Sequence, residues 1–494
     1  MGSFVLAQTL AEGLDYMLGL DSLAPRFLVP SKRIRVLYEP NEFYTYLCNR
    51  IRTAKSRVFL ASLYLGKSES ELVGVLAESL QRNDQLRVYV LVDALRGTRE
   101  APAPCSASLL APLAAKFPHR VHLSMYRTPK LSRIAAALLP KRIIEGAGLQ
   151  HMKIYGWDDE VMLSGANLSQ DYFTNRQDRY ILINDRKVAD HYFKVHSEVS
   201  KLSSRLLPAD NESGFTLTKP DRAAISQAKR DLSALMAPMH SDKPRATADD
   251  TEVYPVCQLT PLGIGNELAV MRQITAAASS SPANSSPANS SPAKYSTAHP
   301  TAIHSSGLTE TTPTITSATE PWLFTAGYFN VEPELGRRLA ASTVPGQVIV
   351  AAPEANGFFQ SRGVSGRIPG FYSYFAEKFM RSLPPGSPVS MREWRKGVVN
   401  TPGGWSYHAK GLWLDHAGRI VTYIGSSNFT RRSYRHDIEC GAVLVAPDTN
   451  NTAGEQIRRE KSHLLENCQS VQSDTKTQLT LSERLFLCIF GDRL

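Results

Sequence analysis

The chain reads His151-Met-Lys153 in its first half and His408-Ala-Lys410 in its second half, and this repetition is the most informative feature of the sequence. In both copies an aspartate follows the lysine at the same spacing, and a turn of small residues that ends in asparagine comes next. An acidic residue then lies at the same separation beyond each asparagine. A single His-x-Lys arises by chance in most chains of this length, whereas two copies with the same further elements in the same order indicate one composite site. The further elements are Asp158, Ser164-Gly165-Ala166-Asn167 and Asp178 in the first copy, and Asp415, Gly425-Ser426-Ser427-Asn428 and Glu439 in the second.

The repeated histidines fit the displacement of a leaving group from a phosphodiester. An imidazole is a good nucleophile and a good proton carrier near neutral pH. Such a displacement needs one group to attack and another to protonate the departing oxygen, so two histidines that face each other across a phosphate supply both roles. Asp178 and Glu439 could each accept a proton from a ring nitrogen and thereby orient the two rings. We predict that the phosphoryl oxygens are bound by Lys153, Lys410, Asn167, Ser426 and Asn428.

The two segments resemble the paired HKD motifs of the phospholipase D superfamily. The first copy departs slightly, because it has Ser-Gly-Ala-Asn where many members have Gly-Ser-x-Asn. Longer stretches resemble the eukaryotic phosphatidylglycerophosphate synthase family, over about residues 31 to 215 and 251 to 465. These stretches include Gly148-Leu-Gln-His151-Met-Lys153, Tyr172-Phe-Thr-Asn-Arg-Gln-Asp178-Arg-Tyr180, Leu63-Tyr-Leu-Gly66 and Ala352-Pro-Glu-Ala-Asn-Gly-Phe-Phe359.

The resemblance implies a phosphatidyltransferase that converts CDP-diacylglycerol and sn-glycerol 3-phosphate to phosphatidylglycerol phosphate and CMP. It implies two α/β/α sandwich domains related by a pseudo-twofold, with one shared active site at their interface. By family analogy His151 attacks the phosphorus and becomes a covalent phosphohistidine, while His408 protonates the leaving CMP. The motif also includes Asp158 and Asp415 among its catalytic residues, although we expect them to support the motif strands rather than touch substrate. No metal or cofactor is required on this interpretation, because the lysines neutralise the phosphate.

The order of apolar segments predicts an α/β fold in each half. Strands and helices alternate, which is typical of a central sheet covered by helices. In the first half we expect strands over 33–37, 57–65, 86–92, 120–126 and 179–183, and helices over 41–53, 69–81 and 131–139. In the second half we expect strands over 253–259, 322–329, 347–352 and 440–445, a strand pair over 408–424 and a helix over 266–277.

Composition divides the chain further. Residues 279–320 are rich in Ser, Thr, Pro and Ala and include tandem Ser-Ser-Pro-Ala units. Such a segment cannot bury enough apolar surface to order, so we predict a disordered insertion inside the second domain. The predicted division is an N-terminal segment over 1–30, a first domain over 31–215, a connector over 216–250, a second domain over 251–470 and a tail over 471–494.

A rival motif runs from Ala61 to Ser68 and matches a loose phosphate-loop pattern that could bind ATP. A working loop needs several glycines so that successive backbone amides face the phosphates. The positions between Ala61 and Gly66 are Ser, Leu, Tyr and Leu, which suit a buried strand. We therefore interpret this stretch as a strand end that leads to the rim of the active site.

The net charge and the spacing of the cysteines indicate which partners and which cellular compartment suit the protein. The net charge of +10 suits an enzyme that acts on anionic phosphates or at an anionic membrane, and it would equally suit nucleic acid binding. The six cysteines show no paired spacing, which argues against a zinc site and favours a reducing compartment. No apolar run reaches the roughly 18 residues of a membrane span, so we expect peripheral contact. The family resemblance implies the mitochondrial inner membrane, although the first 25 residues are acidic and unlike a presequence.

Three alternative functions share parts of this pattern. A related transferase that makes phosphatidylserine or cardiolipin would differ only in its acceptor pocket. A phosphodiesterase or nuclease of the superfamily would pass the phosphohistidine to water. A non-catalytic protein that binds nucleic acid would use the basic charge but would have no reason to keep both His-Lys pairs.

Overall fold

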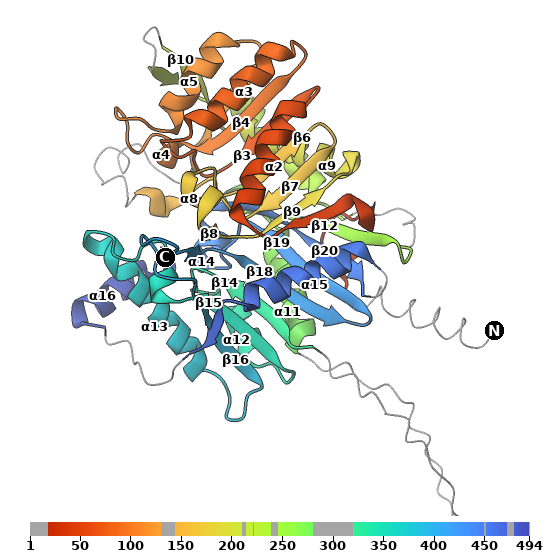
Figure 1. Ribbon diagram of the computed structural model, residues 1–494, viewed down its shortest axis with the longest axis vertical. Helices are drawn as coiled ribbons and strands as arrows, with labels where there is room; N and C mark the ends of the chain where they lie inside the picture. The colour runs from red at the N-terminus through yellow and green to blue at the C-terminus, as the bar shows by residue number, and fades with distance from the viewer. Residues whose placement is uncertain are drawn as a thin grey trace, which may run out of the picture.

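The computed structural model describes residues 18–129, 144–209, 214–220, 222–238, 246–279, 320–448, 451–471 and 479–493. The predicted insertion lies outside these residues apart from its two end positions, and so does the predicted helix over 131–139. Within the described residues the chain forms two large mixed sheets and one two-stranded sheet. Figure 1 shows the first half of the chain above the second half.

The first sheet has nine strands in the described residues, in the order β11-β10-β5-β4-β3-β6-β7-β9-β2. Its centre is the parallel set β3-β4-β5, and β6 pairs antiparallel with β3. Parallel neighbours need a crossover connection, and here the crossovers contain α3 and α5. The strand bounds are β2 Ile34–Leu37, β3 Arg57–Ala61, β4 Arg87–Asp93, β5 Val121–Tyr126, β6 Ile154–Trp157, β7 Glu160–Ser164, β9 Tyr180–Ile183, β10 Ser204–Pro208 and β11 Phe215–Leu217.

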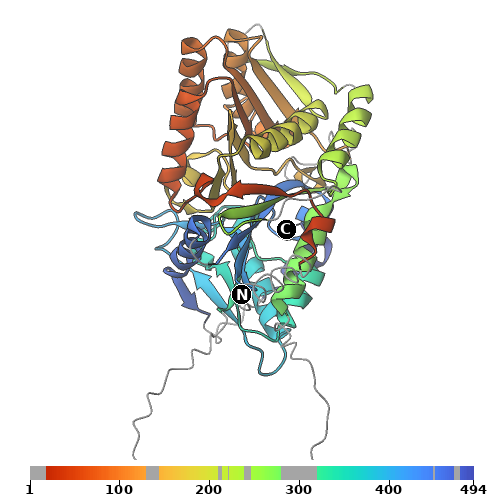
Figure 2. The same ribbon diagram turned by 90° about the vertical axis from the view of Figure 1, so that its right-hand side faces the viewer.

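Helices cover both faces of this sheet, as Figure 2 shows. The helices α2 (Pro40–Thr53), α3 (Ser70–Arg82) and α5 (Ser106–Lys116) share one hydrophobic core with one face of the sheet. On α3 the buried residues Leu72, Val75, Leu76 and Leu80 recur at helical spacing, so one stripe of the helix faces the strands. The other face packs against α9 (Arg186–Lys201), which α10 (Arg222–Leu235) flanks.

The second sheet repeats this topology. Its order is β1-β12-β20-β19-β18-β14-β15-β16-β21, with β13 paired to β12. A parallel set again lies beside antiparallel strands, so β14, β15 and β16 correspond to β3, β4 and β5, while β18, β19, β20 and β12 correspond to β6, β7, β9 and β2. The bounds are β1 Phe27–Pro30, β12 Asp250–Leu259, β13 Ile264–Gly265, β14 Trp322–Ala326, β15 Gly346–Ala351, β16 Val389–Trp394, β18 Lys410–His416, β19 Arg419–Gly425, β20 Ile438–Pro447 and β21 Cys468–Ser470.

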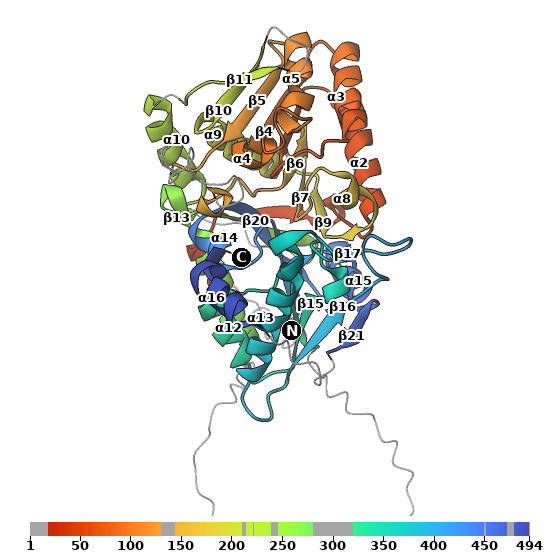
Figure 3. The same cartoon turned by 90° about the vertical axis from the view of Figure 1, so that its left-hand side faces the viewer.

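The helices of the second half also lie on both faces of its sheet. One core joins the sheet to α11 (Asn266–Ser279), α12 (Pro333–Ala340) and α13 (Ile368–Arg381). The helix α15 (Thr452–Leu465) packs on the other face and contacts β2 of the first half. A short helix, α16 (Leu481–Phe490), lies beside α13, as Figure 3 shows.

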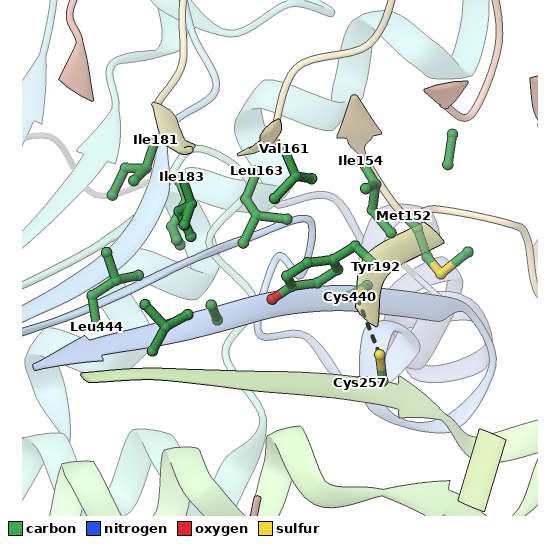
Figure 4. Packing of buried hydrophobic residues seen from close by; sticks show 14 of the residues in the cluster. Met152, Ile154, Val161, Leu163, Ile181, Ile183, Tyr192, Cys257, Cys440 and Leu444 are labelled. Carbon is green, nitrogen blue, oxygen red and sulfur yellow. Dashed lines mark hydrogen bonds between the residues drawn. The ribbon is translucent and has the colours of Figure 1, made fainter. Parts of the chain in front are cut away.

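A single hydrophobic core joins the two halves. Side chains of β6, β7 and β9 pack toward β20, and Tyr192 of α9 lies among them, as Figure 4 shows. The Tyr192 hydroxyl donates a hydrogen bond of 2.9 Å to the carbonyl of Gly441 in β20. The N-terminal strand β1 adds to this connection, because it pairs with β12 at the edge of the second sheet. The halves therefore meet through packed strands, and the two motifs lie along this seam.

Candidate active site

Each motif histidine lies just before a central strand of its own half. Its backbone N–H donates a hydrogen bond to a carbonyl of the other half. The backbone N–H of His151 donates to the carbonyl of Ile438 at 2.9 Å, and Gln150 bridges to Ile438 in parallel register. In the second half, His408 N–H donates to the Gln177 carbonyl at 2.8 Å. Beside it, β17 (Ser406–Tyr407) pairs with β8 (Arg176–Gln177). Ile438 and Gln177 each precede a motif carboxylate, so the two histidine loops are held by related contacts across the seam.

Each motif histidine contacts the carboxylate that belongs to the other half of the chain. His151 Nδ1 lies 3.0 and 2.9 Å from the two carboxyl oxygens of Glu439. His408 Nδ1 lies 2.6 Å from Oδ2 of Asp178. Each histidine is thus oriented by the acidic residue of the opposite copy, and each ring directs Nε2 away from its carboxylate.

Both motif lysines are buried at this seam. Lys153 Nζ donates to the carbonyl of His151 at 2.7 Å, and Lys410 Nζ lies 3.5 Å from Asp178 Oδ2 and 2.7 Å from His408 Nδ1. Burial lowers the pKa of Lys153 well below its ordinary value, while Glu439 opposes the shift. Burial likewise lowers the pKa of Lys410 to about 8, opposed first by Asp178. The two lysines and two carboxylates interact with one another, so both motifs form one electrostatic site.

The titration of the remaining groups follows from burial. Burial, reinforced by the neighbouring lysine, lowers the pKa of His151 well below its ordinary value and that of His408 to about 3. Burial raises the pKa of Glu439 to about 7, against the pull of Lys153. Asp178 differs, because Lys410 and His408 outweigh its burial and hold its pKa below the ordinary value. Both imidazoles are therefore neutral at neutral pH in the free protein, as a nucleophile and a general base require.

The small-residue turns differ between the copies for a steric reason. Ser426 Oγ donates to Glu439 Oε2 at 2.5 Å and so holds the carboxylate that orients His151. The corresponding position in the first copy is Gly165. A Cβ there would lie 2.5 Å from Asp178 Oδ1 and 2.6 Å from Lys410 Nζ, so no side chain fits. The departure of the first copy from Gly-Ser-x-Asn leaves this space for the lysine of the second copy.

The two turn asparagines have different partners. Asn167 accepts the backbone N–H of Leu63 at 3.3 Å and donates to the Tyr172 hydroxyl at 3.0 Å. The side-chain amide oxygen of Asn428, Oδ1, is buried and has no hydrogen-bond partner in the described part of the chain. A phosphoryl oxygen needs a donor, which on Asn428 is the amide Nδ2, and no hydrogen bond of that group occurs among the described residues. The side chains of Asn167 and Ser426 are engaged by the protein.

The motif aspartates lie at the far ends of their strands. Asp158 follows β6 and accepts the backbone N–H groups of Lys55 and Ser56 at 2.8 Å and of Arg57 at 3.1 Å. Asp415, near the end of β18, pairs with Arg458 at 2.7 Å. Neither carboxylate contacts a motif histidine, and these contacts are of the kind expected if Asp158 and Asp415 support the motif strands rather than touch substrate.

Aromatic side chains lie around His408, and none of them is among the predicted catalytic or phosphate-binding residues. The Tyr172 hydroxyl lies 3.4 Å from His408 Nε2. The Tyr328 ring packs edge-on against His408 with centroids 5.1 Å apart, and Tyr372 of α13 stacks on Tyr328. Only Tyr172 had a local signal, since it follows the first asparagine turn. Tyr328 and Tyr372 reach the site through tertiary packing.

The nearby arginines are mostly structural. Arg179 is fully buried and binds both carboxyl oxygens of Glu460 at 2.9 and 2.7 Å. Arg432 donates to Asp437 at 2.9 Å, and Asp437 accepts the N–H of Leu149 just before His151. These arginines brace the motif loops and are not free to bind phosphate.

The segment from Ala61 to Ser68 is a strand end followed by a loop. The backbone N–H of Ser62 donates to Leu91, that of Leu65 to Ser106 and that of Gly66 to Leu168. Amides that are occupied in this way do not form the open cradle of a phosphate loop. Within the described ranges, no three His, Cys, Asp or Glu side chains gather as a metal site would require.

Comparisons with known proteins identify the family. No protein-family model matches the chain. The chain is 37% identical to the CDP-diacylglycerol–glycerol-3-phosphate 3-phosphatidyltransferase of Saccharomyces cerevisiae, in an alignment of 501 residues with its gaps that covers 95% of this chain and 89% of the yeast protein. It is 33% identical to the human protein of that name, which is described as mitochondrial, over 96% of this chain and 85% of the human one.

A solved structure supports the fold. The phosphatidylserine synthase of Haemophilus influenzae superposes with a TM-score of 0.68 over 96% of this chain and 95% of that protein, at 19% identity. Among the described helices, none is both long and apolar enough to cross a bilayer. The two proteins share a mixed α/β fold, which agrees with the α/β class predicted from the sequence. The chain belongs to the family of CDP-diacylglycerol–glycerol-3-phosphate 3-phosphatidyltransferases.

Proposed function

We propose that this enzyme transfers the phosphatidyl group of CDP-diacylglycerol to sn-glycerol 3-phosphate, giving phosphatidylglycerol phosphate and CMP. One observation carries the proposal: two imidazoles, each held by the carboxylate of the other half, share a buried site with two lysines. This set can attack phosphorus, move one proton in each direction and stabilise the charged oxygens. The names of the relatives give the donor and the acceptor.

In the first step, His151 Nε2 attacks the phosphorus that carries the diacylglycerol. The bond from phosphorus to the CMP oxygen breaks, and His408 gives its proton to that oxygen. Burial, reinforced by the charge of Lys410, keeps the pKa of His408 low in the free protein. The anionic diphosphate of the substrate supplies the opposite charge that raises this pKa on binding.

In the second step, glycerol 3-phosphate replaces CMP. His408 Nε2 takes the proton of its hydroxyl, the oxygen attacks phosphorus, and the bond to His151 breaks. Asp178 remains ionised and stabilises the imidazolium that forms on His408. Lys153, Lys410 and Asn428 are the groups that we assign to the non-bridging oxygens. Because the lysines supply the positive charge, we propose that turnover needs no added metal or nucleotide.

Labelled donor tests the assignment of the nucleophile. CDP-diacylglycerol labelled in the diacylglycerol-linked phosphate is mixed with the wild type, His151→Ala and His408→Ala, and the protein is denatured and counted. We expect label on the His408→Ala enzyme and none on the His151→Ala enzyme. Label that survives on His151→Ala would overturn the assignment.

The choice of acceptor tests the substrate. Purified enzyme receives CDP-diacylglycerol with glycerol 3-phosphate, serine, phosphatidylglycerol or water alone. Product with glycerol 3-phosphate alone is the expected result. Transfer to serine, to phosphatidylglycerol or to water would instead indicate phosphatidylserine synthesis, cardiolipin synthesis or hydrolysis.

The donor also suggests where the enzyme works. CDP-diacylglycerol is a bilayer lipid, so we propose peripheral contact with an anionic membrane rather than with nucleic acid. Mammalian relatives are named mitochondrial, and we propose the mitochondrial inner membrane for this chain. Fractionation of cells that express the tagged protein, followed by carbonate extraction, tests both points. Recovery outside mitochondria would contradict the location, and resistance to carbonate would contradict peripheral attachment.

A further inference from the structure

The helix α16 exposes the most prominent apolar side chains in the described part of the chain. Leu481 is 85% exposed and Leu485 is 63% exposed. The next two exposed large apolar residues, Leu207 and Leu217, are 40% and 39% exposed. Residues four apart lie on one face of a helix, so the two leucines of α16 form a single apolar ridge. Exposed ridges of this kind mark surfaces that bind another apolar phase.

The opposite face of α16 is anchored, so the ridge is not a frayed end. Phe486 stacks on Phe371 of α13 with ring centroids 5.5 Å apart. Thr480 and Glu483 form a capping box at the start of the helix. After the helix, the carbonyl of Gly491 accepts a hydrogen bond of 2.8 Å from Asn330.

The ridge is one helix away from the catalytic centre. The helix α13 carries both Phe371, which supports α16, and Tyr372, which stacks on Tyr328. The Tyr328 ring in turn packs against His408. Figure 3 shows α16 on the outer side of α13. A surface that contacts α16 is therefore close to the site that needs a lipid substrate.

A groove of about 690 Å³ lies between α12, α13 and the C-terminal segment. Its walls are largely apolar, and its lining includes three cations. Two of these cations, Arg337 and Lys378, have exposed side chains. The third, Arg431, forms an ion pair with Asp492. The apolar walls include Phe329, Phe375, Phe379 and Leu487.

The charges around the ridge favour an anionic partner. The exposed side chain of Arg484 lies within α16 itself. The acidic residues nearby are each paired with an arginine: Glu483 with Arg367 at 3.4 Å, and Glu377 with Arg381 at 2.6 Å. An apolar ridge flanked by cations is the pattern of a helix that lies in the headgroup region of an anionic bilayer.

We propose that α16 is the membrane-docking element of this enzyme. Leu481 and Leu485 enter the interface of an anionic bilayer, while Arg484, Lys378 and Arg337 face its headgroups. The element holds the His408 side of the site against the surface from which the donor lipid enters. This inference rests on the proposed lipid substrate, but its test does not depend on catalysis.

Vesicle flotation of the full chain tests the proposal. The vesicles are phosphatidylcholine with phosphatidylglycerol, or phosphatidylcholine alone. We expect Leu481→Ser/Leu485→Ser to lower flotation with the anionic vesicles by at least about tenfold. The matched control Leu207→Ser/Leu217→Ser removes two exposed leucines from β10 and β11 and should float like the wild type. Equal flotation of the two double variants would overturn the proposal.

A second measurement tests the proposal even if the double serine variant misfolds. Leu485→Trp and Leu207→Trp each place a fluorophore at an exposed leucine. Anionic vesicles should shift the emission of the Leu485→Trp protein to shorter wavelength and leave that of the Leu207→Trp protein unchanged. No shift for Leu485→Trp would contradict the proposal.

Activity separates docking from chemistry. With a short-chain, water-soluble CDP-diacylglycerol, the Leu481→Ser/Leu485→Ser enzyme should turn over like the wild type. Loss confined to vesicle-borne donor supports docking by α16. Equal loss with the soluble donor would contradict a role limited to docking, and inactivity of the wild type with both donors would contradict the proposed function instead.

Discussion

The two motif centres share a plan but differ in how their histidines are held. His151 rests on Glu439, whose pKa burial raises to about 7 and whose carboxylate Ser426 supports. His408 rests on Asp178, which Lys410 helps to keep ionised. Nε2 of His151 has no hydrogen-bond partner in the described residues, whereas Nε2 of His408 lies 3.4 Å from the Tyr172 hydroxyl.

This difference provides a physical reason for unequal roles, which the repeated sequence motif lacks. A carboxylate whose pKa is held below its ordinary value, as that of Asp178 is, stabilises an imidazolium, so the His408 centre suits a residue that takes up and returns a proton. An uncovered Nε2 suits the nucleophile, which supports the choice of His151. The asymmetry yields four predictions, from the largest expected effect to the smallest.

Removal of each orienting charge should stop a different half reaction. Asp178→Asn presents an amide to His408 and favours the wrong tautomer, and we expect kcat to fall about 10⁴-fold. Glu439→Gln should lower kcat by about 10²–10⁴-fold, because His151, the nucleophile, loses the carboxylate that orients its ring. Quenched-flow labelling distinguishes them: Asp178→Asn accumulates labelled enzyme, and Glu439→Gln forms little. The reverse pattern would exchange the roles of the histidines.

The pH profile should show one limb from each centre. Below about pH 7 Glu439 is protonated and no longer accepts the ring proton of His151, and above about pH 8 Lys410 loses its charge. The kcat/KM should therefore fall about tenfold per pH unit beyond each value. Lys410→Arg keeps its charge and should move the alkaline limb to higher pH. An acid limb that persists unchanged in Glu439→Gln would contradict the assignment.

The tyrosines beside His408 offer a milder comparison. Tyr172→Phe removes a hydroxyl near Nε2, and we expect kcat to fall about five- to tenfold, the worth of one hydrogen bond. Tyr328→Phe keeps the ring that packs against His408 and should change kcat by less than about threefold. Steady-state assays at saturating substrate measure both, and equal losses would mean that the Tyr172 contact has no special role.

The motif aspartates should affect stability rather than rate. Asp158→Asn weakens several hydrogen bonds from residues 55–57 and should lower the free energy of unfolding by about 1–3 kcal/mol. Asp415→Asn loses a partly exposed ion pair and should cost less than about 1 kcal/mol. Urea denaturation gives both values, and kcat should stay within about twofold.

The pH dependence of these two variants provides a control. The pKa of Asp158 is lowered by its hydrogen bonds, which outweigh burial. Its contribution is therefore present above the unfolded pKa and is lost as pH falls through the folded pKa. The gap in stability between the wild type and Asp158→Asn should narrow in acid. A large loss of kcat in either variant would restore a catalytic role for the aspartates.

Local sequence predicted many elements because their apolar patterns match their burial. The expected helix over 41–53 is α2, which begins at Pro40, and the expected strand over 440–445 lies within β20. The expected strand over 57–65 ran too far, since β3 ends at Ala61. Leu63 and Leu65 are buried beyond it, where side-chain groups of Asn167 and Ser106 accept their N–H groups. An apolar run thus indicated burial correctly but did not distinguish a strand from a buried loop.

The long-range features of the site could not be read from the pattern. The motif positions indicated that Asp178 and Glu439 orient histidines, but spacing along the chain did not indicate which histidine each one binds. The contribution of β1 to the second sheet, and that of Tyr328 to the surroundings of His408, depend on how the halves pack. Such contacts come from tertiary structure, which no single stretch of sequence specifies.

The exchange of carboxylates makes the two halves mutually dependent. If the chain were cut between them, each fragment would retain a whole His-x-Lys motif, and the second sheet would lose only β1, yet neither fragment would contain a histidine together with its acceptor. Both centres would be lost at one cut and regained together on reassociation, so fragment complementation would be all-or-none. The two halves must therefore evolve together, because a substitution at either carboxylate changes the orientation of the histidine in the other half.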